Sequence, residues 1–227
     1  MLLSIIRQNQ KLAAKRNPAF DRNRFAKFLI YFMVAFWAAY LIFIGVMLSF
    51  AFEDIFPSME PYHIMNQGLI YLLILDFLLR FMLQPAMSQE IKPYLLMPIK
   101  KNKLVDTLLL QSGISSYNFF WFFLIIPFAL LTIIRFYGLT GILCYLCGIW
   151  LLMVMNSYWY LICKTLLNEK LLYILLPIGV YGLLAGTEFI PEGNPVSTFM
   201  MNLGEGFIEG NILAFLGVIA AILLLLL

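Results

Sequence analysis

Residues 28–52 read FLIYFMVAFWAAYLIFIGVMLSFAF and contain no charged side chain. An apolar run of about 20 residues is long enough to cross roughly 30 Å of hydrocarbon as a helix. The whole chain has 227 residues, of which 63% are hydrophobic and only 12% are charged, whereas a typical soluble domain carries about 25% charged residues. The mean hydropathy is +0.92. This composition excludes a soluble enzyme and predicts an all-α integral membrane protein.

Further apolar stretches along the chain predict a single transmembrane domain over residues 1–227, with six transmembrane helices. The predicted spans cover about 28–52, 64–87, 107–134, 139–163, 171–187 and 211–227. The last two are near the lower length limit for spanning. The final span ends in five leucines, and a helix that stops inside the apolar layer leaves its last carbonyls without partners. We therefore expect either that the natural chain continues, with residues 1–227 as the N-terminal half of a longer protein, or that the sequence covers only its ordered part.

The distribution of basic residues predicts the orientation in the membrane. Of the 15 Lys and Arg residues, all except Arg135 lie before the first span, between the second and third, between the fourth and fifth, or in the second span itself. Cytoplasmic loops carry such an excess of Lys and Arg. We therefore expect a multi-pass protein of the inner (cytoplasmic) membrane with a cytoplasmic N-terminus. Residues 1–27 are a basic segment with two possible interpretations: an interfacial helix that meets membrane lipids, or a disordered basic lead-in to the first span.

The segment 89–106, QEIKPYLLMPIKKNKLVD, separates the second and third predicted spans. Its apolar positions are followed by a cluster of lysines, and Pro93 and Pro98 introduce bends. This pattern favours a short helix on the cytoplasmic membrane surface. The alternative is an ordinary basic loop, which needs the lysines but not the apolar residues before them.

This segment resembles a pattern found after the second span of ABC-2-type transporter permeases, namely Leu-Leu, any residue, Pro, Ile or Val, Arg or Lys, three positions, and Val. The matching residues are Leu95, Leu96, Pro98, Ile99, Lys100, Lys101, Leu104 and Val105. The chain most resembles an uncharacterised bacterial branch of that family. The resemblance implies an interfacial coupling helix that contacts a cytoplasmic ABC ATPase through Leu95, Leu96, Pro98, Ile99, Lys100, Lys101 and Lys103.

The resemblance also implies the other parts of a transporter. A second permease half or a homodimer would complete the membrane domain, and no nucleic acid would be a partner. The chain contains no G-x-x-x-x-G-K-[ST] sequence, which binds nucleotide phosphates in P-loop ATPases. We therefore expect ATP and Mg to bind a partner subunit, while this chain is not an enzyme and binds no cofactor.

Asp76 and Arg80 are ionisable residues inside the second predicted span, four positions apart and so on one helix face. Charges within a membrane are rare and often functional. Two interpretations are open. The residues could lie on a substrate path or at the interface between protomers, with Asp76 the better candidate. Alternatively, they form an intrahelical ion pair with Arg80 reaching toward the inner headgroups.

The fifth predicted span combines Pro177 with Gly179, Gly182 and Gly186. The G-x-x-x-G spacing allows two helices to approach closely, and a proline beside glycines could kink the helix or act as a hinge. Cys144 and Cys147 form a C-x-x-C in an apolar span, but no other ligand is spaced for a metal site. No metal is expected.

Two function classes fit these observations. The first is a permease subunit of an ATP-driven exporter that moves a lipid, a glycan or another amphipathic substrate. The second is a non-transporting membrane scaffold or assembly subunit of an envelope complex, for which the same helices and basic loop need only hold a partner. An intramembrane enzyme is disfavoured because the sequence has no G-x-S-x-G, H-E-x-x-H or clustered carboxylates.

Overall fold

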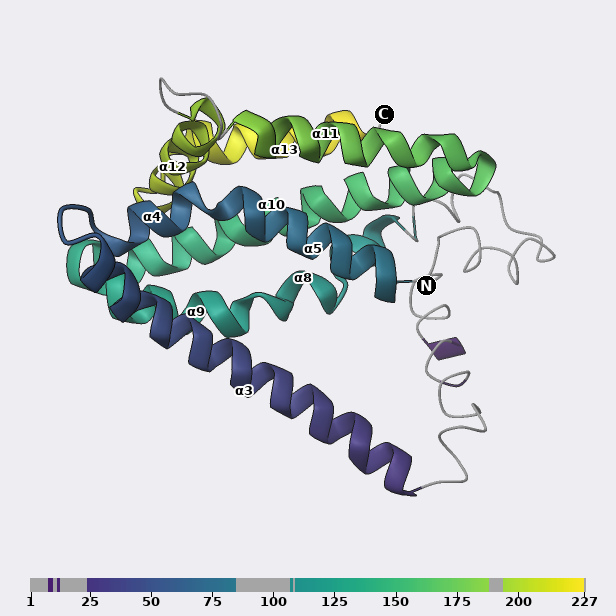
Figure 1. Ribbon diagram of the computed structural model, residues 1–227, viewed down its shortest axis with the longest axis horizontal. Helices are drawn as coiled ribbons and strands as arrows, with labels where there is room; N and C mark the ends of the chain where they lie inside the picture. The colour runs from purple at the N-terminus through teal and green to yellow at the C-terminus, as the bar shows by residue number, and fades with distance from the viewer. Residues whose placement is uncertain are drawn as a thin grey trace.

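The computed structural model describes residues 8–9, 12, 24–84, 107, 109–187 and 194–226, and every regular element in these ranges is a helix. Helix α3 (Arg24–Ile55) extends along one side and diverges from the other helices toward its N-terminal end (Figure 1). The elements that follow are α4 (Pro61–Gln67), α5 (Leu69–Leu83), α8 (Tyr117–Phe120), α9 (Phe122–Thr132), α10 (Ile134–Glu169), the short 3-10 helix η2 (Leu171–Ile174), α11 (Leu175–Gly186), α12 (Pro195–Ile208) and α13 (Ile212–Leu226).

The lengths of these helices are those of an α-helical membrane protein. Lys27–Ile55 and Ile134–Glu169 are each long and apolar enough to cross a membrane. Three bent pairs also pass this test, which gives up to five spans if each pair forms one. The segment predicted as the fifth span, 171–187, corresponds to a shorter apolar helix, Leu171–Gly186.

Two of the bent pairs divide predicted spans, whereas the third joins the last predicted span to α12, which precedes it and was not predicted as a span. Helices α4 and α5 meet at 49°, and the helical stretch Leu109–Phe120 meets α9 at 59°. Helices α12 and α13 meet at 116°, so the chain turns by somewhat more than a right angle between them. Gly210, with φ of 73°, lies in this turn, in a backbone region that disfavours side chains with a Cβ.

Helix α10 forms the centre of the fold and packs against α5, α9, α12 and α13 (Figure 1). Its helical course is interrupted at Gly138, with φ of 62° and ψ of −161°. The regular part therefore begins close to residue 139, where the sequence predicts the fourth span. Tyr145, Ile149, Leu152 and Met153 of α10 are buried and join the core formed with α5 and α9.

Close helix contacts occur at isolated glycines. A Cβ placed on Gly148 of α10 would lie 2.2 Å from the ring of Phe207 in α12, and one on Gly45 of α3 would lie 2.2 Å from the Leu124 carbonyl oxygen of α9. By contrast, a Cβ on any glycine of the predicted packing motif in α11 would meet nothing within 4 Å; these glycines are Gly179, Gly182 and Gly186. The close approach expected there therefore has no partner within the described chain.

The N-terminal half of α3 extends beyond these contacts and exposes large apolar side chains. Three ring pairs follow one another at helical spacing, Phe28–Phe32, Phe32–Phe36 and Phe36–Tyr40, with centroids 6.2, 6.4 and 6.4 Å apart. Such a surface would be costly in water and is ordinary in lipid.

Candidate functional site

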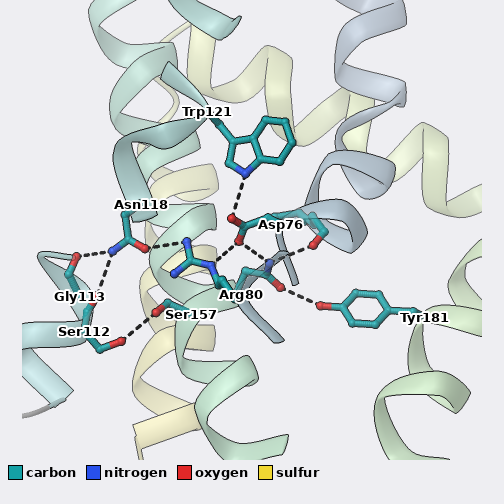
Figure 2. Close-up of polar contacts among 10 residues, drawn as sticks. Asp76, Arg80, Ser112, Gly113, Asn118, Trp121, Ser157 and Tyr181 are labelled. Atoms are coloured by element: carbon teal, nitrogen blue, oxygen red, sulfur yellow. Dashed lines mark hydrogen bonds and ion pairs between the residues drawn. The ribbon is translucent and has the colours of Figure 1, made fainter. Parts of the chain in front are cut away.

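The side chain of Asp76 in α5 is the centre of a buried polar network (Figure 2). Its Oδ2 accepts hydrogen bonds from Arg80 Nε and Asn156 Nδ2, each at 2.7 Å. Its Oδ1 accepts a third from Trp121 Nε1 at 2.9 Å. Asp76 is only 3% exposed, so these three donors replace the water that a carboxylate would otherwise bind.

Arg80 extends the network toward the helical stretch before α9. Its Nη2 donates to Asn118 Oδ1 at 2.8 Å, and Asn118 Nδ2 donates to the carbonyl oxygens of Ser112 and Gly113. The Ser112 hydroxyl lies 2.9 Å from that of Ser157 in α10. Among the described residues, Arg80 Nη1 is buried without a hydrogen-bond partner.

Asn156 of α10 joins the ion pair to α11. Its Nδ2 donates to the Leu73 carbonyl oxygen at 2.9 Å as well as to Asp76, and its Oδ1 accepts from the Tyr181 hydroxyl at 2.7 Å. Figure 2 shows Tyr181 approaching from the side opposite Asn118. The network therefore ties α5, the α8–α9 region, α10 and α11 together through polar contacts that are buried around Asp76 and Arg80 and partly buried at Tyr181.

These contacts bear on both interpretations of Asp76 and Arg80. The two side chains form the intrahelical ion pair that their spacing permits. Arg80 is only 1% exposed, however, so its guanidinium is turned into the protein and does not extend outward. Its further partner Asn118 and the other donors to Asp76 come from distant segments. Sequence reasoning missed Asn118, Trp121, Asn156 and Tyr181, although polar amides inside apolar spans are a recognisable signal.

A second polar contact holds the C-terminal end of α5. Lys164 Nζ of α10 donates to the Phe81 carbonyl oxygen at 3.0 Å and to that of Gln84, and Tyr160 donates to the same Gln84 oxygen at 2.7 Å. The ammonium also lies 5.4 Å from the Phe81 ring centroid and 5.2 Å from that of Tyr160. A cation at a helix C-terminus satisfies free carbonyls and complements the helix dipole. We call this contact the α5 clamp.

The α5 clamp predicts a specific effect of neutralising Lys164. The Lys164→Met variant keeps most of the aliphatic stem but removes the charged donor, so the free energy of unfolding should fall by about 1.5–3 kcal/mol. The Lys170→Met variant removes an exposed lysine from the same region and should change it by less than about 0.5 kcal/mol. Thermal and denaturant unfolding of the purified proteins in one detergent measures both. Equal losses from the two variants would contradict the clamp.

Two further polar contacts, one of them an ion pair, are present near the opposite end of these helices. His63 Nδ1 of α4 lies 2.5 Å from Glu205 Oε1 of α12, and Arg135 Nη1 lies 2.9 Å from Glu53 Oε1. These pairs are partly or largely exposed and connect α4 to α12 and α3 to α10. No group of three or more potential metal-ligating side chains occurs among the described residues.

The remaining predicted site residues are placed as follows. Pro177 is the buried residue of α11, whereas the three glycines beside it face open space. The predicted coupling residues Leu95, Leu96, Pro98, Ile99, Lys100, Lys101 and Lys103 lie outside the described residues. The described chain resumes helical structure at residues 109–113, a stretch that ends with the Ser112 and Gly113 carbonyls of the network.

Comparison with known proteins gives a family without an assigned activity. No curated protein and no solved structure matches the chain. A family profile, described as a family of unknown function (DUF5687), matches residues 10–227. This match covers nearly all of the chain, including α3 to α13 and every residue of the buried network. The chain therefore belongs to the DUF5687 family.

Proposed function

We propose that the chain is the transmembrane permease subunit of an ABC-2-type transporter, which exports a lipid or another amphipathic substrate and is energised by a separate cytoplasmic ATPase. In this proposal six segments cross the inner membrane, and the N-terminus and the segment 89–106 are cytoplasmic. The observation that carries the proposal is the α5 clamp. It fixes the end of α5 to α10 just before the segment whose sequence resembles a coupling helix.

The arrangement of contacts supports a mechanical role for this segment. A force applied after Gln84 would reach α5 through its clamped end and would reach α10 through Lys164 and Tyr160. Helix α5 also carries Asp76 and Arg80, which are bonded to the α8–α9 region and to α10. These helices would therefore move as one body. Helix α11 is joined to these helices through the Tyr181–Asn156 hydrogen bond, so it would move with them, although it contributes fewer buried residues to the core.

The identity of the cytoplasmic partner tests the proposal. The tagged full-length chain is extracted gently from its native membrane, and the proteins that accompany it are identified by mass spectrometry. We expect a stoichiometric soluble protein with Walker A and B sequences. Recovery of an envelope protein with no such ATPase would reject the permease proposal and favour a scaffold.

The lysines of segment 89–106 should determine whether that ATPase binds. Reversing Lys100, Lys101 and Lys103 to Glu should reduce the recovered ATPase by about tenfold or more at low salt, because an acidic rim on the partner would be repelled. The control reverses Lys11, Lys15 and Arg16 to Glu, which makes the same charge change in the N-terminal segment. Unchanged recovery with the first variant, at normal membrane insertion, would refute the coupling contact.

A further inference from the structure

A cavity of about 340 Å³ lies between α5, α10, α11 and α13, with Met200 of α12 also in its wall. Its volume lies within the range of small-molecule sites, which is about 300–1,000 Å³. Trp159 of α10, Leu184 of α11 and Ala221 of α13 are among its lining residues. None of the site residues predicted from the sequence lines this cavity. The helices that form it are far apart in the chain.

Most of the side chains that line the cavity are apolar. The amide of Asn156 and the hydroxyl of Tyr181 bond to each other and to the buried network, and the remaining side-chain N–H group in the wall is the Trp159 indole, a single donor. A water molecule needs two to four polar partners to be held in a cavity. A charged or sugar-like group would likewise lose its hydration without compensation. The chemistry of the wall therefore selects a hydrocarbon.

The surroundings of the cavity indicate where this hydrocarbon would come from. The outer sides of α11 and α13 carry exposed apolar residues such as Leu183, which is 76% exposed, and Leu223. The two helices lie along one edge of the fold (Figure 1). Because these faces are apolar in a membrane protein, the cavity between the two helices borders the bilayer interior. A ligand can therefore enter sideways from lipid without crossing water.

We propose that this cavity binds the alkyl chain of a membrane amphiphile, such as a phospholipid. If the cavity is the substrate site, the transported substrate is a lipid with an alkyl chain. This assignment rests on the proposed permease function. Chain binding itself requires no ATPase. The Tyr181–Asn156 hydrogen bond forms part of the cavity wall and leads to Asp76, so an inserted chain touches the residue pair that links α11 to the buried ion pair.

The test uses the full chain in lipid nanodiscs that contain a phosphatidylcholine with a diazirine in its palmitoyl chain. After irradiation, mass spectrometry locates the labelled residues. We expect label on cavity residues such as Trp159 and Met155. Ala221→Trp fills the cavity and should reduce that label by about tenfold, whereas Ala220→Trp places the same side chain on the exposed side of α13 and should leave it unchanged.

A second pair of variants keeps the test decisive if Ala221→Trp does not fold. Leu184→Trp fills the cavity from α11, and Leu183→Trp is its exposed control. Cavity label that both filling variants leave unchanged would overturn the proposal, as would label confined to exposed positions such as Phe32. Because the nanodisc contains no ATPase, failure to find an ATPase partner would refute the permease role without affecting this result.

Discussion

Replacing Asp76 by alanine should lower the free energy of unfolding by about 3–5 kcal/mol, because Arg80 would remain buried without its counter-charge. The same change removes the acceptor of the Trp121 indole and one acceptor of the Asn156 amide. Unfolding of the purified variants by heat or denaturant in detergent measures the loss of stability. The exposed pair Glu53–Arg135 provides the control. Glu53→Ala should change stability by about 0–1 kcal/mol, since exposed ion pairs contribute little.

The double variant Asp76→Leu, Arg80→Met separates charge from packing in this prediction. It removes both buried charges together, so it should be more stable than either single variant. It should still be less stable than the natural chain, by about 1–3 kcal/mol, because the Trp121 donor has lost its partner. If Asp76→Ala were no more damaging than Glu53→Ala, the buried network around Asp76 would not stabilise the packing of α5 against α10 and the α8–α9 region.

Gly148→Ala should destabilise the protein by about 1–3 kcal/mol, although alanine is the better helix former by about 1 kcal/mol. The reason is the 2.2 Å separation between a Cβ at this position and the Phe207 ring, which is fully buried and cannot move aside freely. The predicted sign is therefore opposite to the one that helix propensity alone gives. Thermal unfolding in detergent measures it.

Gly182→Ala is the matched control for that prediction. A Cβ at Gly182 of α11 would meet nothing within 4 Å, so helix propensity should decide and stability should stay equal or rise. The Phe207→Ala variant lacks the ring. In that variant, Gly148→Ala should lower the free energy of unfolding by less than it does in the natural chain. A stabilising Gly148→Ala would show that α10 and α12 do not meet at this point.

Helix content and location were largely predictable from the sequence, because apolar runs of membrane length admit little other than helices. The breaks within those runs were not. The bend of 49° at Gly68 lies within the predicted second span and depends on how the helices pack, and helix α12, which turns by 116° into α13, was not predicted as a span. Gly138 illustrates the difference: the predicted fourth span starts directly after it, but its left-handed backbone was not foreseen.

The buried site was predictable only in part, for a related reason. Asp76 and Arg80 share one helix, so their spacing alone permits the pair. Asn118 and Asn156 join it from elsewhere in the chain, and only the tertiary arrangement brings them together. The glycine motif of α11 shows the opposite case. Regularly spaced glycines give α11 a face that another helix could approach closely, but no helix among the described residues packs against it. The close helix contacts form at Gly45 and Gly148 instead.

The intrahelical position of the ion pair has a consequence for biogenesis. A single charged side chain at the centre of an inserting helix is penalised by about 2.5–3.5 kcal/mol. Asp76 and Arg80 bond within α5, so part of this penalty is offset inside the helix itself and needs no contribution from a later segment. Asn118 and Trp121 follow in the chain, then Asn156 and finally Tyr181. Each of these residues therefore has a network partner that precedes it in the sequence.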